Sequence, residues 1–79
     1  MIYLRLFTTQ GCHLCEQAQA MLAQLPTEQE LLLCEVEIGD DDALTEQYGI
    51  RIPVLQLPDE TELNWPFSQQ DVLNALHIS

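Results

Sequence analysis

Residues 2–15 read IYLRLFTTQGCHLC, and this stretch decides the fold. Its first residues are almost all apolar or β-forming, which predicts a strand over 2–8 that is buried on both faces. Thr8-Thr9-Gln10-Gly11 then breaks the pattern. The helix formers that follow predict a helix from Cys12 to Leu25, which Pro26 ends. A buried strand therefore passes directly into a helix that begins with a pair of cysteines.

The rest of the chain predicts five more elements. We expect a strand over 31–38, a helix over 40–48 with Gly49 as its C-cap, strands over 52–57 and 62–65, and a helix over 69–77 capped by Ser68. The first helix should face the core through Leu14, Ala18, Met21, Leu22 and Leu25. The order β-α-β-α-β-β-α predicts one α/β domain over 1–79, with a mixed four-stranded sheet covered by helices on both faces.

The charge balance limits the possible partners. The chain has 13 acidic residues against two basic ones, Arg5 and Arg51, for a net charge of −11. Such a surface repels phosphate, so we expect neither nucleic acid nor membrane as a partner. No apolar stretch reaches the ~18 residues of a membrane span. The first residues lack a basic leader, so we expect a cytoplasmic protein. The acids are spread along the chain, and the run 40–42 suits a helix start.

The motif Cys12-His13-Leu14-Cys15 carries the chemistry. A cysteine at a helix N-terminus lies near unpaired N–H groups and the positive end of the helix dipole, and both favour the nucleophilic thiolate. A second cysteine one turn later can resolve a mixed disulfide from within the protein. We therefore predict that Cys12 attacks and is the more exposed thiol. Cys15 should resolve and be the more buried one.

Alternatives stay open around this motif. A protonated His13 would lower the pKa of Cys12, or else His13 faces solvent without a role. The cysteine pair is also half of a zinc site, but zinc needs two further ligands, and Cys34, His13 and His77 form no second paired motif. We therefore expect redox chemistry and no metal. Cys34 is expected to pack in the core, and Trp65 either packs there or forms an aromatic wall for a substrate.

Three segments together resemble the thioredoxin superfamily, and most closely its small glutaredoxin-like proteins. They are the Cys12–Cys15 motif, YGIRIPVL at 48–55 and WPFS at 65–68. The resemblance implies a cis peptide bond before Pro53, packed beside the cysteines. It also implies that the backbone of Ile52 pairs with an extended thiol substrate. The residues expected to contact a substrate are Arg51, Ile52, Pro53 and His13.

The chain departs from glutathione-binding glutaredoxins in two places. Residues 9–11 contain no basic residue before the first cysteine, and residues 64–68, NWPFS, lack the Gly-Gly-acid sequence that receives the glutathione carboxylate in that family. Glutathione is an anion, and this chain is strongly acidic. We therefore expect no tightly bound cofactor, with glutathione left as an open alternative.

The resemblance implies an enzyme, namely a glutaredoxin-like thiol–disulfide oxidoreductase. It would act on protein or low-molecular-weight disulfides and so take part in electron transport and cell redox homeostasis. The expected partner is a disulfide-containing protein or a small thiol, and the expected state is a monomer. One alternative is a thioredoxin-fold binding module without catalytic activity. Another is a metal or iron–sulfur carrier that uses Cys12 across a dimer.

Overall fold

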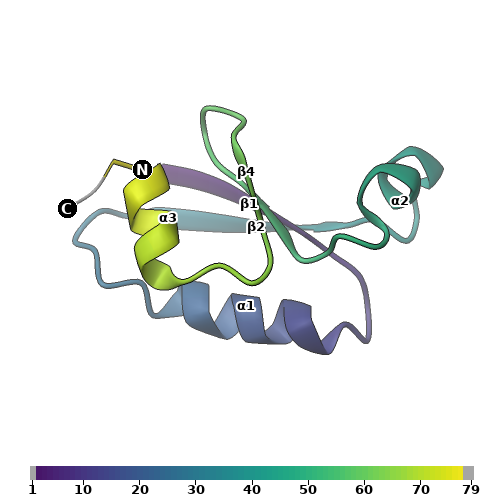
Figure 1. Cartoon of the computed structure of the whole chain (residues 1–79), viewed down its shortest axis with the longest axis horizontal. Coiled ribbons are helices and arrows are strands. Elements are labelled where there is room, and N and C mark those ends of the chain that lie inside the picture. Colours follow the sequence, from purple (N-terminus) through teal and green to yellow (C-terminus); the bar gives the residue numbers. More distant parts are fainter. Residues whose placement is uncertain (1, 78–79) are drawn as a thin grey trace.

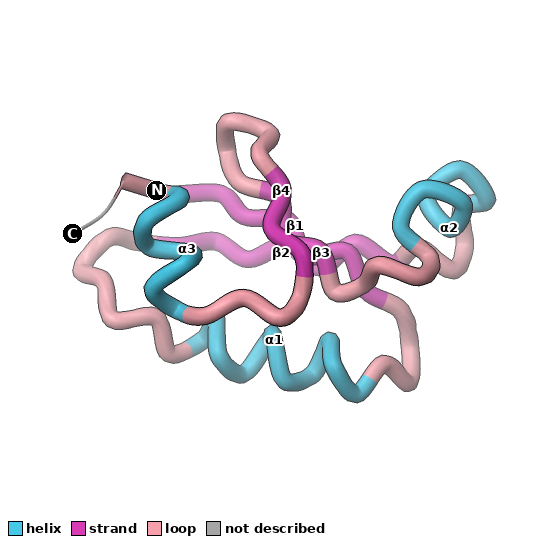
Figure 2. Tube along the Cα trace, in the orientation of Figure 1, coloured by secondary structure: helices cyan, strands magenta, loops and turns pink. Residues whose placement is uncertain are grey.

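The computed structural model describes residues 2–77 and contains the predicted elements in the predicted order (Figures 1 and 2). They are β1 (Ile2–Thr8), α1 (His13–Ala23), β2 (Leu31–Glu37), α2 (Asp42–Tyr48), β3 (Val54–Gln56), β4 (Glu62–Asn64) and α3 (Gln69–Ala75). Several of them are shorter than expected by a residue or two at an end. The expected fold class is confirmed.

The four strands form one mixed sheet in the order β2-β1-β3-β4. β1 is parallel to β2 and antiparallel to β3, and β3 is antiparallel to β4. The parallel register pairs Thr8 with Glu37, so β1 and β2 end side by side. The loop that follows β1 therefore lies against the end of β2, and this loop carries the cysteine motif.

The larger core lies between the sheet and the helices α1 and α3, which share one face of the sheet. Figure 1 shows α1 running the length of the sheet, with α3 packed near its far end. The buried members are Leu4, Leu6, Ala18, Leu22, Leu55, Leu57, Phe67 and Val72. Burying such side chains supplies the main driving force for folding, at about 1.5–3 kcal/mol each.

The second core lies on the other face of the sheet, under α2. Phe7 and Tyr48 stack there with ring centroids 4.2 Å apart, beside Val54. The expectation that β1 is buried on both faces is wrong for its first half, where Tyr3 and Arg5 are exposed. The reason is that α2 is short and lies at one end of the sheet, so it covers only the end that contains Phe7 (Figure 1).

Local side chains fix the ends of the short helices. Asp41, in the acidic run predicted to start a helix, caps α2 by accepting from the Leu44 N–H at 3.1 Å. Ser68 and Asp71 form a capping box at the start of α3, with bonds of 3.0 and 2.9 Å. Gly49 is the C-cap of α2 as expected, and a Cβ there would lie 2.5 Å from the Thr45 carbonyl oxygen.

Candidate functional site

The loop between β1 and α1 places Cys12 at the start of the helix. Gly11 has φ +78°, in the left-handed region that favours glycine, so the chain turns sharply just before Cys12. The Cys12 N–H donates to the Thr9 carbonyl at 3.3 Å and closes the turn. Cys12 is then the N-cap of α1. A tight turn next to a helix N-terminus is thus encoded by the four residues that precede the motif.

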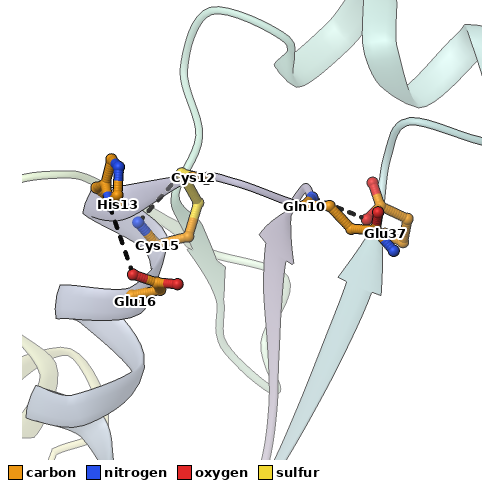
Figure 3. The surroundings of a disulfide bond; sticks show 6 residues. All are labelled: Gln10, Cys12, His13, Cys15, Glu16 and Glu37. Atoms are coloured by element: carbon orange, nitrogen blue, oxygen red, sulfur yellow. Dashed lines mark hydrogen bonds and ion pairs between the residues drawn. A yellow bond between two sulfur atoms is a disulfide. The ribbon is translucent and has the colours of Figure 1, made fainter.

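Cys12 and Cys15 form a disulfide, with Cα atoms 5.2 Å apart. Cys12 is partly exposed, whereas Cys15 is 1% exposed, so the expected difference in exposure is confirmed. The Cys15 N–H donates to the Cys12 sulfur at 3.1 Å (Figure 3). After reduction, this N–H and the positive end of the helix dipole would both stabilise a Cys12 thiolate. The geometry therefore suits an attacking Cys12 and a resolving Cys15.

The residues between the cysteines face outward. The His13 side chain is 91% exposed, and its Nδ1 lies 3.6 Å from the Glu16 carboxylate, an ion pair when the imidazole is protonated (Figure 3). Leu14 is 47% exposed, so its predicted place in the core stripe is wrong. In the first turn of α1 the residue that faces the core is Cys15, and Ala18 and Leu22 continue the buried stripe along the helix. Leu14 lies beside this stripe.

The segment before β3 lies beside the cysteine motif. The Ile52–Pro53 bond is cis, as the resemblance implied, and Pro53 is fully buried. A hollow of about 330 Å³, here called the apolar hollow, joins this segment to the first turn of α1. It is lined by Leu14, Ile50, Arg51, Ile52, Asn64 and Trp65. The Ile52 N–H donates to the Tyr48 carbonyl at 3.1 Å, so strand pairing by a substrate through this donor would compete with an internal bond.

Arg51 lines the apolar hollow, but a carboxylate neutralises its charge. Its guanidinium lies 2.9 Å from Glu62 and 5.2 Å from the centre of the Tyr48 ring. The Tyr48 hydroxyl donates to the other Glu62 oxygen at 2.6 Å, and this bond raises the pKa of Tyr48 above its ordinary value. Glu62 thus ties the segment before Pro53 to β4. Neither Tyr48 nor Glu62 was expected at the site.

A second hollow, of about 220 Å³, lies on the β2 side of the disulfide and is here called the acidic hollow. Both cysteines line it, together with Glu16, Gln19, Glu35, Glu37 and the loop 8–11. Glu37 accepts from the N–H groups of Gly39 at 2.7 Å and Gln10 at 3.1 Å. The bond from Gly39, followed by one from the Thr9 hydroxyl, lowers the pKa of Glu37.

Glu35 and Glu37 were not expected at this site, although the sequence contains a signal for them. Residues 33–37 alternate along a strand, so Glu35 and Glu37 lie on the same face as Leu33. The register of the parallel pair sets Glu35 opposite Leu6 and Glu37 opposite Thr8. This is the face that α1 covers, which brings both carboxylates to the end of the helix that carries the motif.

Cys34 lies apart from this site. It pairs with Arg5 in the sheet, on the face opposite α1, and is partly exposed rather than packed in the core as expected. The neighbouring Cys34 side chain raises the pKa of the Tyr3 hydroxyl above its ordinary value. Among residues 2–77, no group of three or more His, Cys, Asp and Glu side chains is arranged to hold a metal ion. No helix in this part of the chain is long and apolar enough to cross a membrane.

Trp65 packs on the core and also borders the apolar hollow. Its ring packs edge-on against the buried Phe67, with centroids 5.1 Å apart, and it also lines the apolar hollow. The core contact fixes the ring in place. The hollow therefore has an aromatic side chain in its lining together with Leu14.

Comparison with known proteins agrees with this geometry. Residues 3–77 match the family model described as "Glutaredoxin-like domain (DUF836)". The chain belongs to this glutaredoxin-like family. No relative was found among the curated proteins.

Solved structures extend the likeness of this glutaredoxin-like domain. The X-ray structure of target protein XcR50 from X. campestris is 40% identical, with a TM-score of 0.82 over 94% of this chain and 95% of that one. The solution structure of Ne2328 from Nitrosomonas europaea is 28% identical, with a TM-score of 0.78 over 99% and 92%. A malarial protein at 13% identity, with a TM-score of 0.71, shares the fold alone.

Proposed function

We propose that this glutaredoxin-like domain is a thiol–disulfide oxidoreductase that reduces protein or low-molecular-weight disulfides. The observation that carries the proposal is the Cys12–Cys15 pair, which is at bonding distance with one sulfur accessible and the other buried. Two further features support it. The Cys15 N–H points at the Cys12 sulfur, and the segment before Pro53 forms a hollow with the first turn of α1.

The reaction would start from the reduced dithiol. The Cys12 thiolate attacks one sulfur of a substrate disulfide, which breaks that S–S bond, releases one thiolate and forms a mixed disulfide with Cys12. The Cys15 thiolate then attacks the Cys12 sulfur and releases the second substrate thiolate. Two electrons pass to the substrate, two protons end on its thiols, and the Cys12–Cys15 disulfide is restored. An external thiol would reduce that disulfide for the next cycle.

The expected cofactor state follows from the charges at the site. Three carboxylates line the acidic hollow, and the guanidinium of Arg51 is paired with Glu62. An anion such as glutathione would be repelled by the carboxylates on one side of the disulfide. On the other side it would meet Arg51, whose charge is already paired with Glu62. We therefore propose that glutathione is not tightly bound.

Single cysteine variants test the proposal. The substrate is 2-hydroxyethyl disulfide, which is small and neutral. Every protein tested also carries Cys34→Ser, so that the thiols of the motif are the only ones that can react. Cys12→Ser should abolish reduction. Cys15→Ser should complete only the first step and accumulate a mixed disulfide visible by mass spectrometry.

The pKa of Cys12, measured from the pH dependence of alkylation, gives a second readout. A value well below about 8.5 is expected for an activated thiol. Reduction that persists in Cys12→Ser would contradict the proposal. An unreactive Cys12 with an ordinary pKa would instead favour a binding module with a structural disulfide.

A further inference from the structure

Two different surfaces flank the reactive disulfide, one toward each edge of the sheet. β2 and β4 are the edge strands, so the acidic hollow, which includes β2 residues, and the apolar hollow, which includes Asn64 of β4, lie on opposite sides of the motif. Both reach the first turn of α1, the acidic one through Cys12 and Cys15 and the apolar one through Leu14. A substrate bonded to Cys12 would therefore lie between two chemically distinct surfaces.

The apolar hollow is suited to a hydrophobic side chain. Leu14 is 47% exposed and Ile50 is fully exposed, so both expose apolar surface to water in the free protein. Trp65, which packs edge-on against Phe67, lines the hollow with them. Covering these side chains with an apolar group would remove that surface from water. Arg51 and Asn64 are the polar members of the lining, and the charge of Arg51 is paired with Glu62.

The acidic hollow is suited to a cation. Glu16 and Glu35 are exposed, and the Glu16 side chain is 71% exposed, so both can reorient toward a ligand. Glu37 is fixed by its bonds to Gln10 and Gly39, and its pKa is lowered, so it is ionised at neutral pH. The nearest basic side chain in the motif is His13, which already faces Glu16. The hollow therefore has an excess of negative charge next to Cys12.

We infer that the preferred substrate is a polypeptide cysteine with an apolar side chain on one side of it and Lys or Arg on the other. The apolar side chain would cover Leu14 and Ile50, and the basic one would face Glu16 and Glu35. This inference rests on the proposed function and specifies its substrate class. A domain with this preference would select positively charged substrates, whereas an enzyme that receives an anionic thiol selects negatively charged ones.

Model peptides test the inference directly. Each peptide contains one cysteine with Ile on one side and Lys on the other, in either order. The cysteine is blocked as a mixed disulfide with neutral 2-mercaptoethanol. Matched peptides replace Lys by Glu or Ile by Ser. The pre-reduced protein supplies the electrons, and release of the peptide thiol is followed in a single turnover. For the better of the two orders, the Lys peptide should react about tenfold faster than its Glu counterpart in low salt, and this ratio should fall in high salt.

Paired variants separate local charge from total charge. Glu16→Gln with Glu35→Gln should bring the Lys-to-Glu rate ratio close to one. Glu28→Gln with Glu30→Gln changes the net charge equally, in the loop that leads into the other end of β2, and should leave the ratio nearly unchanged. Ile50→Ser should cut the preference for the Ile peptide over the Ser peptide, and it is compatible with the fold because Ile50 is fully exposed.

The results that would overturn this inference differ from those that would overturn the proposed function. Equal rates for Lys and Glu peptides, with normal reduction of 2-hydroxyethyl disulfide, would overturn the inference and leave the oxidoreductase proposal intact. A ratio that drops equally in both paired variants would assign the effect to net charge and also overturn it. Failure to reduce the neutral disulfide would overturn both proposals.

Discussion

Glu37, the last residue of β2, accepts a hydrogen bond of 3.1 Å from the backbone N–H of Gln10, two residues before Cys12 (Figure 3). Its other carboxylate oxygen accepts from Gly39 at 2.7 Å. One side chain thus joins the loop that carries the cysteine motif to the turn after β2. The position of Cys12 depends on a residue far from it in sequence.

We expect Glu37→Ala to lower the melting temperature and to slow the alkylation of reduced Cys12. The substitution removes the acceptor for two backbone N–H groups and releases the loop before the motif. Glu37→Gln keeps one acceptor oxygen and should lie between the wild type and Glu37→Ala. Glu46→Ala, at an exposed carboxylate of α2, is the control. An unchanged melting temperature in Glu37→Ala would show that the loop does not need this anchor.

Acid should destabilise the protein partly through two hydrogen-bonded carboxylates, the half-buried Glu37 and the exposed Asp59. Hydrogen bonds lower the pKa of Glu37 from 4.5, first through Gly39, and that of Asp59 from 3.8, first through the Thr61 N–H. The folded state therefore binds protons more weakly than the unfolded state. The stabilising contribution is present above the ordinary values and is lost as pH falls through the lower folded-state values.

The measurement for this effect is the melting temperature from neutral pH down to about pH 3. Glu37→Gln combined with Asp59→Asn should flatten the curve below about pH 4.5, because amides do not titrate. Parallel curves for the wild type and the double variant would contradict the assignment.

Tyr48→Phe should reduce the free energy of unfolding by about 1.5–3 kcal/mol, the range for a hydrogen bond to a charged group. The variant keeps the stacking on Phe7 but leaves one Glu62 oxygen without its donor. Because the pKa of Tyr48 is raised, the contribution is present below pH 10.0 and is lost as pH rises through the folded-state value. Urea unfolding measures it, and the exposed Tyr3→Phe serves as the control, with a smaller expected effect.

Ser68→Ala should reduce the free energy of unfolding by about 1 kcal/mol, the usual cost of losing an N-cap. The substitution leaves the Asp71 N–H without its acceptor at the start of α3. Ser68→Asp should restore most of the loss, since aspartate is an equally good cap. Equal unfolding curves for Ser68→Ala and the wild type would mean that solvent satisfies this N–H.

The order and type of the elements predicted from local patterns were confirmed. Strand β1, a break in the pattern at residues 8–11 and helix α1 follow one another as expected, because strand propensity and helix starts are set within a few residues. The resemblance located the cis bond before Pro53. Leu14 was misplaced because helical spacing gives the stripe but not its rotation about the helix axis, which depends on what the helix packs against.

The sequence alone determined the order of elements, the acidic charge and the placement of Cys12 and Cys15 in one helical turn, since each depends on neighbouring residues. Only the tertiary structure decided what surrounds them. Glu37 is 27 residues from Gln10, and Glu62 is 14 from Tyr48, so these contacts exist only after the sheet has set its register. The two hollows beside the disulfide are products of strand pairing, because their walls come from opposite edges of the sheet.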